Sequence, residues 1–182
     1  MGTNDARDDR ETASAVIWQL AVKSSARLPY DTSAITDQLF IAARPRAWHV
    51  EDLRGLGVDL VLSMTVSAPP RFLAEPPFQL LRLPTVDFWF FPIPLRLLRR
   101  GVAAALPVLE RGGRVLVHCR GGRHRSVVMA ACILVAMGMT ADEAMDIITA
   151  HRAIADPHAW HMEPRIRAFE RDWLRRKSAA QN

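Results

Sequence analysis

The sequence is poor in several features that would point to particular protein classes. It has two cysteines, Cys119 and Cys132, which are too few for a disulfide framework and fit a reducing compartment. Its longest uninterrupted apolar run covers residues 127–137, about half of what a helix needs to cross a bilayer. The first residues, MGTNDARDDRE, are acidic and lack the basic segment that begins a secretory signal peptide. We therefore expect a cytoplasmic protein.

Lysine is also scarce, since among 24 basic residues only Lys23 and Lys177 are lysines. The formal net charge of +5 predicts a mild attraction to anions. No stripe of arginines and aromatics and no base-reading motif accompanies this charge, so the sequence does not indicate a nucleic-acid partner. The 182 residues suffice to bury a core without a disulfide or a structural metal.

Apolar runs of strand length alternate with helical patterns along most of the chain. Strands are expected at 39–42, 59–63, 79–83 and 114–118, and the second and fourth are nearly continuous valine and leucine, as in sheets covered on both faces. Helices are expected at 49–56, 95–111, 125–137, 141–151 and 163–177, and Pro107 should kink or shorten the second of these. The alternation predicts an α/β fold with a central, mostly parallel sheet of four to five strands, flanked by helices on both faces.

The chain has no internal repeat and no shift in composition, so we expect a single domain at 31–177. Residues 1–30 would form an N-terminal extension, partly helical around 13–23 or frayed, and residues 178–182 a disordered tail. We expect a monomer.

The segment HCRGGRHRS, residues 118–126, lies between an expected strand and an expected helix. In α/β sheets ligands bind beyond the carboxyl ends of the strands, and the N-terminus of the next helix attracts anions. Gly121 and Gly122 allow successive backbone amides to turn inward, and Arg125 offers a planar fork for two phosphate oxygens. Such surroundings favour a thiolate, so the pKa of Cys119 should lie below its ordinary value. The segment predicts a phosphate-binding loop with a nucleophilic cysteine.

These residues fit the signature HCxxGxxR(S/T), and over residues 37–173 the chain resembles the cysteine-dependent protein tyrosine phosphatases, with the length and spacing of their compact dual-specificity subgroup. The resemblance implies a phosphomonoester hydrolase that needs no metal and no cofactor. It implies that Cys119 attacks phosphorus, Arg125 holds the phosphate, Ser126 helps the sulfur to leave and His118 orients the loop. The implied substrate-binding positions of the loop are Arg120, Gly121, Gly122, Arg123 and His124.

The same family uses an upstream aspartate as general acid, because the leaving oxygen must be protonated. In LPTVDFWFFP, Asp87 lies 32 residues before Cys119, after an expected strand and before an expected helix, and is our candidate. Glu75 is the alternative, although it precedes the intervening strand. The four aromatic residues 88–91 cannot all point inward, so we expect one or two of them to line the rim of the site or to touch a partner.

Two substrate classes stay open. The first hypothesis is a dual-specificity protein phosphatase that acts on tyrosine, serine and threonine phosphates. The alternative is a phosphatase of an anionic lipid or inositol phosphate, because Arg120 and Arg123, with His124 beside the latter, resemble the loops of relatives that act on inositol lipids or phosphatidylglycerophosphate. The DFWFFP segment looks like the acid loop of that branch, and its aromatics could contact a membrane peripherally. The expected partner is a phosphorylated protein or a small anionic phosphoester.

Two readings lie outside phosphatase chemistry. A rhodanese-like sulfurtransferase also has a cysteine in an arginine-bearing loop before a helix, but it needs no general acid. A catalytically inactive phosphate-binding module would require neither the nucleophile Cys119 nor the acid Asp87 beside Arg125. Cys132 lies in the apolar run and is expected in the core.

Overall fold

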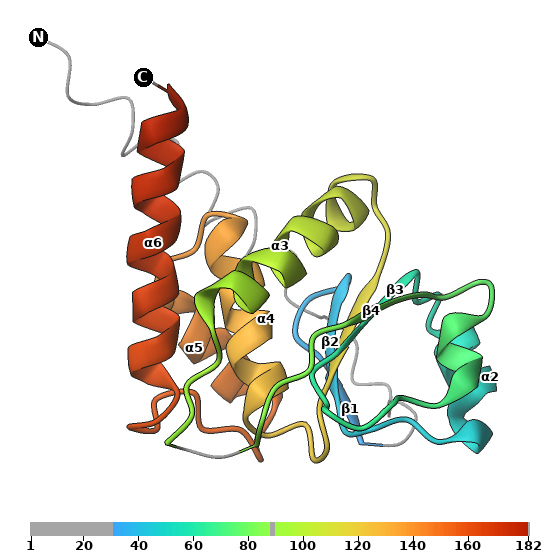
Figure 1. Cartoon of the computed structure of the whole chain (residues 1–182). Helices are drawn as coiled ribbons and strands as arrows, with labels where there is room; N and C mark the ends of the chain where they lie inside the picture. Colours follow the sequence, from blue (N-terminus) through green and yellow to red (C-terminus); the bar gives the residue numbers. More distant parts are fainter. Residues whose placement is uncertain (1–30, 88–89, 182) are drawn as a thin grey trace, which may run out of the picture.

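The computed structural model of this protein describes residues 31–87 and 90–181 (Figure 1). Within them, five strands form one sheet in the spatial order β1-β2-β5-β3-β4. The strands are β1 (Thr32–Ala34), β2 (Leu39–Ala42), β3 (Leu60–Ser63), β4 (Gln79–Arg82) and β5 (Val115–His118). Only the pair β1–β2 is antiparallel among the pairs in this described sheet, so the predicted mostly parallel sheet is confirmed. The helix expected around 13–23 lies outside the described residues.

Helices cover both faces of the sheet, as expected (Figure 1). One face carries α3 (Leu95–Glu110), α4 (Arg125–Ala136), α5 (Ala141–His151) and α6 (Glu163–Gln181). The other face carries α2 (Val50–Gly55) and the 3-10 turns η1 (Ala47–His49) and η2 (Arg71–Ala74). Along the strands, Ile41 and Val117 pack against the first layer and Phe40 and Leu116 against the second, as the alternation of side chains in a strand requires.

The long apolar run forms most of α4, which is buried almost all round between the sheet and the helices α3, α5 and α6. Cys132 lies in this helix and is fully buried, as expected, and burial raises the pKa of its thiol. In the described part of the chain, no helix combines the length and the hydrophobicity that a bilayer span requires.

Three features differ from the sequence-based expectations. The edge strand β1 was not predicted, because three half-buried residues carry no strand pattern of their own. Pro107 does not shorten α3, which runs on to Glu110, because Pro107 and Ala103 are exposed and the carbonyl that loses its partner there faces solvent. The helix α6 continues to Gln181 instead of ending before a disordered tail, since residues 178–181 include two alanines and the Ser178 hydroxyl donates a hydrogen bond to the Leu174 carbonyl.

The four parallel strands end level with one another. Their last residues, Ala42, His118, Ser63 and Arg82, are register partners across the sheet. The segments that follow these strands therefore start from the same edge, which is where the phosphate-binding loop was expected.

Candidate active site

The loop at residues 119–124 leaves the carboxyl end of β5 and enters the first turn of α4. Gly122 has a φ of 64°, a left-handed conformation that suits glycine. A Cβ atom there would lie 2.7 Å from the backbone C and O atoms of Ala42 and would also collide with the Arg152 guanidinium. At Gly121 a Cβ would meet nothing within 4 Å. Only the second glycine is therefore required by the backbone.

Cys119 is almost completely buried at the base of this loop. Its Sγ atom lies 3.3 Å from the Ser126 hydroxyl, and the Gly122 amide donates a hydrogen bond to it at 3.2 Å. Burial by itself would raise the pKa of Cys119. The hydrogen bonds from Ser126 and Gly122 and the charge of Arg125 outweigh burial, so the pKa of the thiol is lowered from its ordinary value. The direction agrees with the sequence-based expectation.

His118 is fully buried and precedes the cysteine. Its Nδ1 atom lies 3.2 Å from the Cys119 carbonyl oxygen, which can only accept, so Nδ1 carries the proton. Burial lowers the pKa of His118 to about 4, and the ring is neutral at pH 7. A neutral ring bonded to the loop backbone fixes the conformation of the loop at Cys119.

Arg125 is held by the segments that follow β3 and β4. Its Nη1 atom donates to the Met64 carbonyl at 2.9 Å and to the Thr85 carbonyl at 3.0 Å. Its Nη2 atom lies 2.7 Å from Oδ2 of Asp87, while its buried Nε has no hydrogen-bond partner in the described part of the chain. The guanidinium is thus fixed from three sides, and its Nε–H donor stays available for a ligand.

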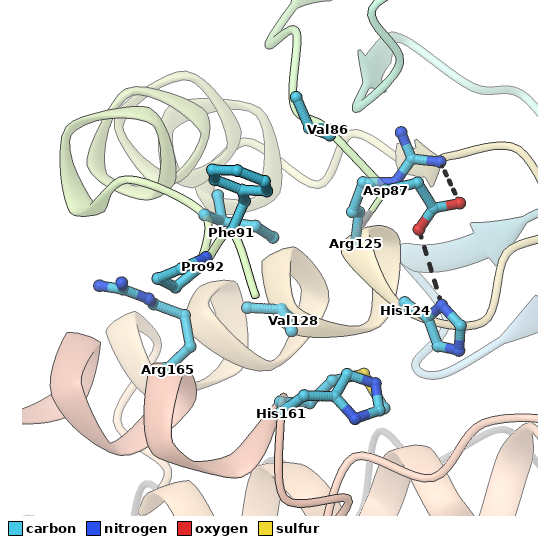
Figure 2. A pocket seen from close by; sticks show the side chains of 11 residues that line it. Val86, Asp87, Phe91, Pro92, His124, Arg125, Val128, His161 and Arg165 are labelled. Carbon is cyan, nitrogen blue, oxygen red and sulfur yellow. Dashed lines mark ion pairs between the residues drawn. The ribbon is translucent and has the colours of Figure 1, made fainter. Parts of the chain in front are cut away.

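Asp87 points at the loop from the segment after β4 (Figure 2). Besides its ion pair with Arg125, its Oδ1 atom lies 3.6 Å from Nδ1 of His124. Its side chain is 41% exposed, so solvent and a substrate can both reach it. Glu75, the alternative acid, is exposed after η2 and lines neither of the two pockets at this site.

The two pockets meet at Val86, Asp87 and Arg125. One, the acid-loop pocket, has a volume of about 260 Å³ and extends between the segment around Phe91, α4 and the start of α6 (Figure 2). The other, the basic groove, has about 1280 Å³. Four arginines line this groove: Arg44, Arg46, Arg120 and Arg125.

The three loop residues singled out for substrate choice separate in the structure. Arg120 lines the basic groove, His124 lines the acid-loop pocket, and Arg123 is exposed and lines neither. In the groove, the Arg46 guanidinium lies 5.3 Å from the ring centre of Trp48, an exposed side chain. Arg120 is thus the loop residue that shares a surface with further cations.

Aromatic side chains do reach the rim, as predicted. Phe91 lines the acid-loop pocket, and the Phe90 ring lies 6.3 Å from that of Trp160. All three are largely exposed. Phe88 and Trp89 lie outside the described residues.

Arg152, at the end of α5, was missed by the sequence-based reasoning. Its side chain is buried. The Nε atom donates a hydrogen bond to the Gly122 carbonyl at 2.6 Å, and the Nη2 atom forms an ion pair with Asp31 at 2.9 Å. Its Nη1 donates to the Ser33 hydroxyl at 3.1 Å. Arg152 therefore ties the phosphate-binding loop to the edge of the sheet. No local motif predicts this role, because the residues that Arg152 contacts are 30 to 121 positions away from it in the chain.

Residues 39–171 match the family model described as "Dual specificity phosphatase, catalytic domain". The curated human (Homo sapiens) dual specificity protein phosphatase 2 is 28% identical over 141 residues, which cover 75% of this chain and 44% of the relative. The Mus musculus protein of the same name is 31% identical over 114 residues, covering 60% of this chain and 35% of the relative. The chain spans less than half the length of these two curated relatives.

Solved structures are similar over nearly their whole length. A mouse putative dual specificity phosphatase complexed with zinc tungstate has a TM-score of 0.73 at 24% identity, covering 86% of this chain and 96% of that one. A crystal structure of PTPMT1 has a TM-score of 0.68 at 27% identity, covering 83% and 99%. PTPMT1 in complex with PI(5)P has a TM-score of 0.71 at 23% identity, covering 81% and 99%. The described fold agrees with these structures.

Proposed function

Because this chain belongs to the dual-specificity phosphatase family, we propose that it hydrolyses phosphomonoesters through a phosphocysteine intermediate and without a metal ion. The observation that carries the proposal is the meeting of Cys119, Arg125 and Asp87 at one edge of the sheet. The thiol has a lowered pKa, the guanidinium keeps a buried free donor, and the carboxylate is within reach of solvent.

In the first step the Cys119 thiolate forms a bond to phosphorus while the bond to the leaving oxygen breaks. Arg125 and the loop amides hold the phosphoryl oxygens, where the charge of the transferring group lies. The incoming phosphate competes with Asp87 for the Arg125 guanidinium and so releases the carboxylate from its ion pair. The released Asp87 takes up a proton from solvent and donates it to the leaving oxygen as the bond to phosphorus breaks.

In the second step the Asp87 carboxylate takes a proton from water, whose oxygen attacks phosphorus. The bond between sulfur and phosphorus breaks, and inorganic phosphate leaves. Ser126 stabilises the departing thiolate, because its hydroxyl lies within hydrogen-bonding distance of the sulfur atom. His118 and Arg152 act as positioning residues that hold the loop backbone on both sides of the sulfur.

The first candidate substrate is a phosphorylated side chain of a protein. The names of both curated relatives support it. The Cys119 sulfur lies buried at the base of the loop, so a substrate must reach it with its phosphate end first.

The second candidate is an anionic lipid or inositol phosphate, and the basic groove favours it. Arg44, Arg46 and Arg120 share the surface that adjoins Arg125, and a substrate with further phosphates would meet these cations. The similar fold of PTPMT1, crystallised with PI(5)P, supports this candidate.

The reaction class is tested by assaying p-nitrophenyl phosphate in EDTA with the wild type and C119S. We expect activity in the wild type alone, and a metal requirement of the wild type would overturn the proposal. The D87N variant distinguishes a phosphatase from a sulfurtransferase. If D87N releases phosphate much more slowly than the wild type, the result supports the phosphatase. If its turnover is unchanged and the protein consumes thiosulfate, the result supports the sulfurtransferase.

The substrate class is tested by comparing phosphotyrosine and phosphothreonine peptides with inositol phosphates, in the wild type and R120Q. A lipid-type enzyme would lose most of its preference for inositol phosphates in R120Q. A protein-type enzyme would hydrolyse the peptides far faster than every inositol phosphate.

A further inference from the structure

The acid-loop pocket contains a basic side chain that the proposed reaction does not use. Arg165, in the first turn of α6, lines this pocket, and its buried Nε atom has no hydrogen-bond partner in the described residues. The guanidinium takes part in no ion pair with any described residue. The other arginine of the lining, Arg125, is instead paired with Asp87. Arg165 is therefore the cation of this pocket that has no counter-ion within residues 31–87 and 90–181.

The rest of the lining is mainly apolar. Besides the two arginines, Asp87, His124 and His161, the lining consists of Val86, Phe91, Pro92, Ile93, Val128 and Met162. His161 adds a ring whose Nδ1 is buried without a partner in the described chain. Burial, and after it the charge of His124, lowers the pKa of His161, so its ring is neutral at pH 7. An apolar chamber with an unpaired arginine at its edge suits a ligand that has an apolar body and an anionic group.

The position of the pocket relates it to the leaving group. Asp87 and Arg125 line both the pocket and the reacting centre, and the leaving oxygen must lie beside Asp87 to receive its proton. In Figure 2 the Asp87–Arg125 pair lies on one side of the pocket and Arg165 on the other, with Val128 between them. A leaving group that extends from Asp87 along Val128 thus ends near Arg165.

We propose that the acid-loop pocket is a leaving-group subsite, in which the apolar side chains cover the body of the leaving group and Arg165 pairs with a second anionic group on it. The inference rests on the proposed phosphatase function and narrows its substrates. The preferred phosphoester carries a second anion, a carboxylate or a phosphodiester, separated from the reacting phosphate by an apolar spacer.

Two small substrates test the subsite. Phenyl phosphate is compared with an aryl phosphate that bears a carboxylate on a short chain opposite the ester oxygen. For the wild type we expect kcat/KM to be about five- to tenfold higher for the carboxylated ester, the effect of one charge-assisted hydrogen bond at a partly exposed site. In R165Q the ratio of the two kcat/KM values should fall to about one.

Two further variants make this result specific to Arg165. R171Q removes an exposed arginine further along α6, outside the pocket, and should keep the wild-type ratio. R165E should prefer an aryl phosphate with an ammonium group in place of the carboxylate. Because each result is a ratio within one protein preparation, a partly unfolded variant changes both rates and leaves the ratio interpretable.

The failures of the two proposals are distinguishable. If the wild type hydrolyses neither ester, the phosphatase proposal itself fails. If it hydrolyses both at equal kcat/KM, or if R165Q keeps the preference, the subsite is refuted while the phosphatase stands.

The second anion could come from an acidic residue beside a phosphorylated side chain or from the phosphodiester of a lipid head group. Two substrate pairs separate these sources: a phosphopeptide with and without a neighbouring glutamate, and a short-chain lipid phosphomonoester with and without a phosphodiester. The pair that shows a preference in the wild type and loses it in R165Q identifies the source. If the wild type shows no preference for the substrate with the second anion in either pair, the result counts against the subsite.

Discussion

Replacing Gly122 by alanine tests whether the shape of the phosphate-binding loop controls activity. The residue has a left-handed φ of 64°, which costs an alanine roughly 1–2 kcal/mol. The new Cβ would lie 2.7 Å from backbone atoms of Ala42, whereas ordinary contacts begin at 3.4 Å. Because the obstacle is the backbone of a buried strand, the loop itself must move by about 0.7 Å, the difference between these two distances.

A shift of this size displaces the amide that bonds the sulfur of Cys119. Misplacement of about 1 Å at a reacting centre can lower a rate about a hundredfold, so we expect kcat of G122A to fall by about that factor. The assay is steady-state hydrolysis of p-nitrophenyl phosphate, with urea unfolding as a check that the variant folds.

G121A is the matched control, since a Cβ at Gly121 would meet no atom within 4 Å. We expect it to lose far less activity than G122A. A folded G122A with nearly full kcat, or an equal loss in both variants, would refute the argument from loop geometry.

Three further predictions concern the residues around the loop. S126A removes a hydrogen bond that lowers the pKa of Cys119, so the pKa should rise and the pH midpoint of alkylation by iodoacetate should move upward; an unmoved midpoint contradicts this. His118 has a pKa of about 4 in the fold against 6.5 for an ordinary histidine, so below pH 6.5 the unfolded chain takes up a proton that the folded chain does not. The free energy of unfolding should therefore decrease by up to about 3 kcal/mol as the pH falls from 6.5 to 4. Urea unfolding of the wild type and of H118Q over this pH range measures the decrease, and H118Q should lack the part that His118 causes. R152K keeps the positive charge but loses the planar guanidinium that reaches the Gly122 carbonyl. We expect kcat to fall about tenfold or more, with a smaller change in KM. If the kcat of R152K equals that of the wild type, this contact does not position the loop.

The phosphate-binding loop was predictable because its chemistry is local. The residues that bond Cys119, namely Gly122 and Ser126, lie three and seven positions away, and the strand before them and the buried helix after them have clear hydrophobic patterns. The position of Asp87 beside this loop was predictable for a different reason. Asp87 follows a parallel strand, and parallel strands bring the segments after their ends to the same edge of the sheet.

The support of the loop was not predictable in the same way. Arg152 reaches Gly122 and Asp31 only after α5 has packed against α4 and β1 has paired with β2. These contacts depend on tertiary packing, and among the many arginines of the chain nothing in the neighbouring sequence distinguishes Arg152.

The acid-loop pocket could not be predicted from the sequence for a similar reason. Asp87, Val128 and Arg165 belong to three segments whose relative positions depend on how α6 crosses α4. The hydrophobic pattern of α6 indicates its buried face, since Ile166 and Phe169 are fully buried and lie three residues apart. It did not indicate that Arg165 lies beside the site.

The formation of a phosphocysteine is the most direct test of the proposed reaction. The wild type and C119S are mixed with p-nitrophenyl phosphate in EDTA, quenched in acid and digested, and the peptide that contains residue 119 is weighed by mass spectrometry. If the proposed reaction is right, the wild-type peptide gains one phosphoryl group on Cys119 and the C119S peptide gains none. A phosphoryl group on another residue of an active enzyme, or turnover by C119S, would contradict it.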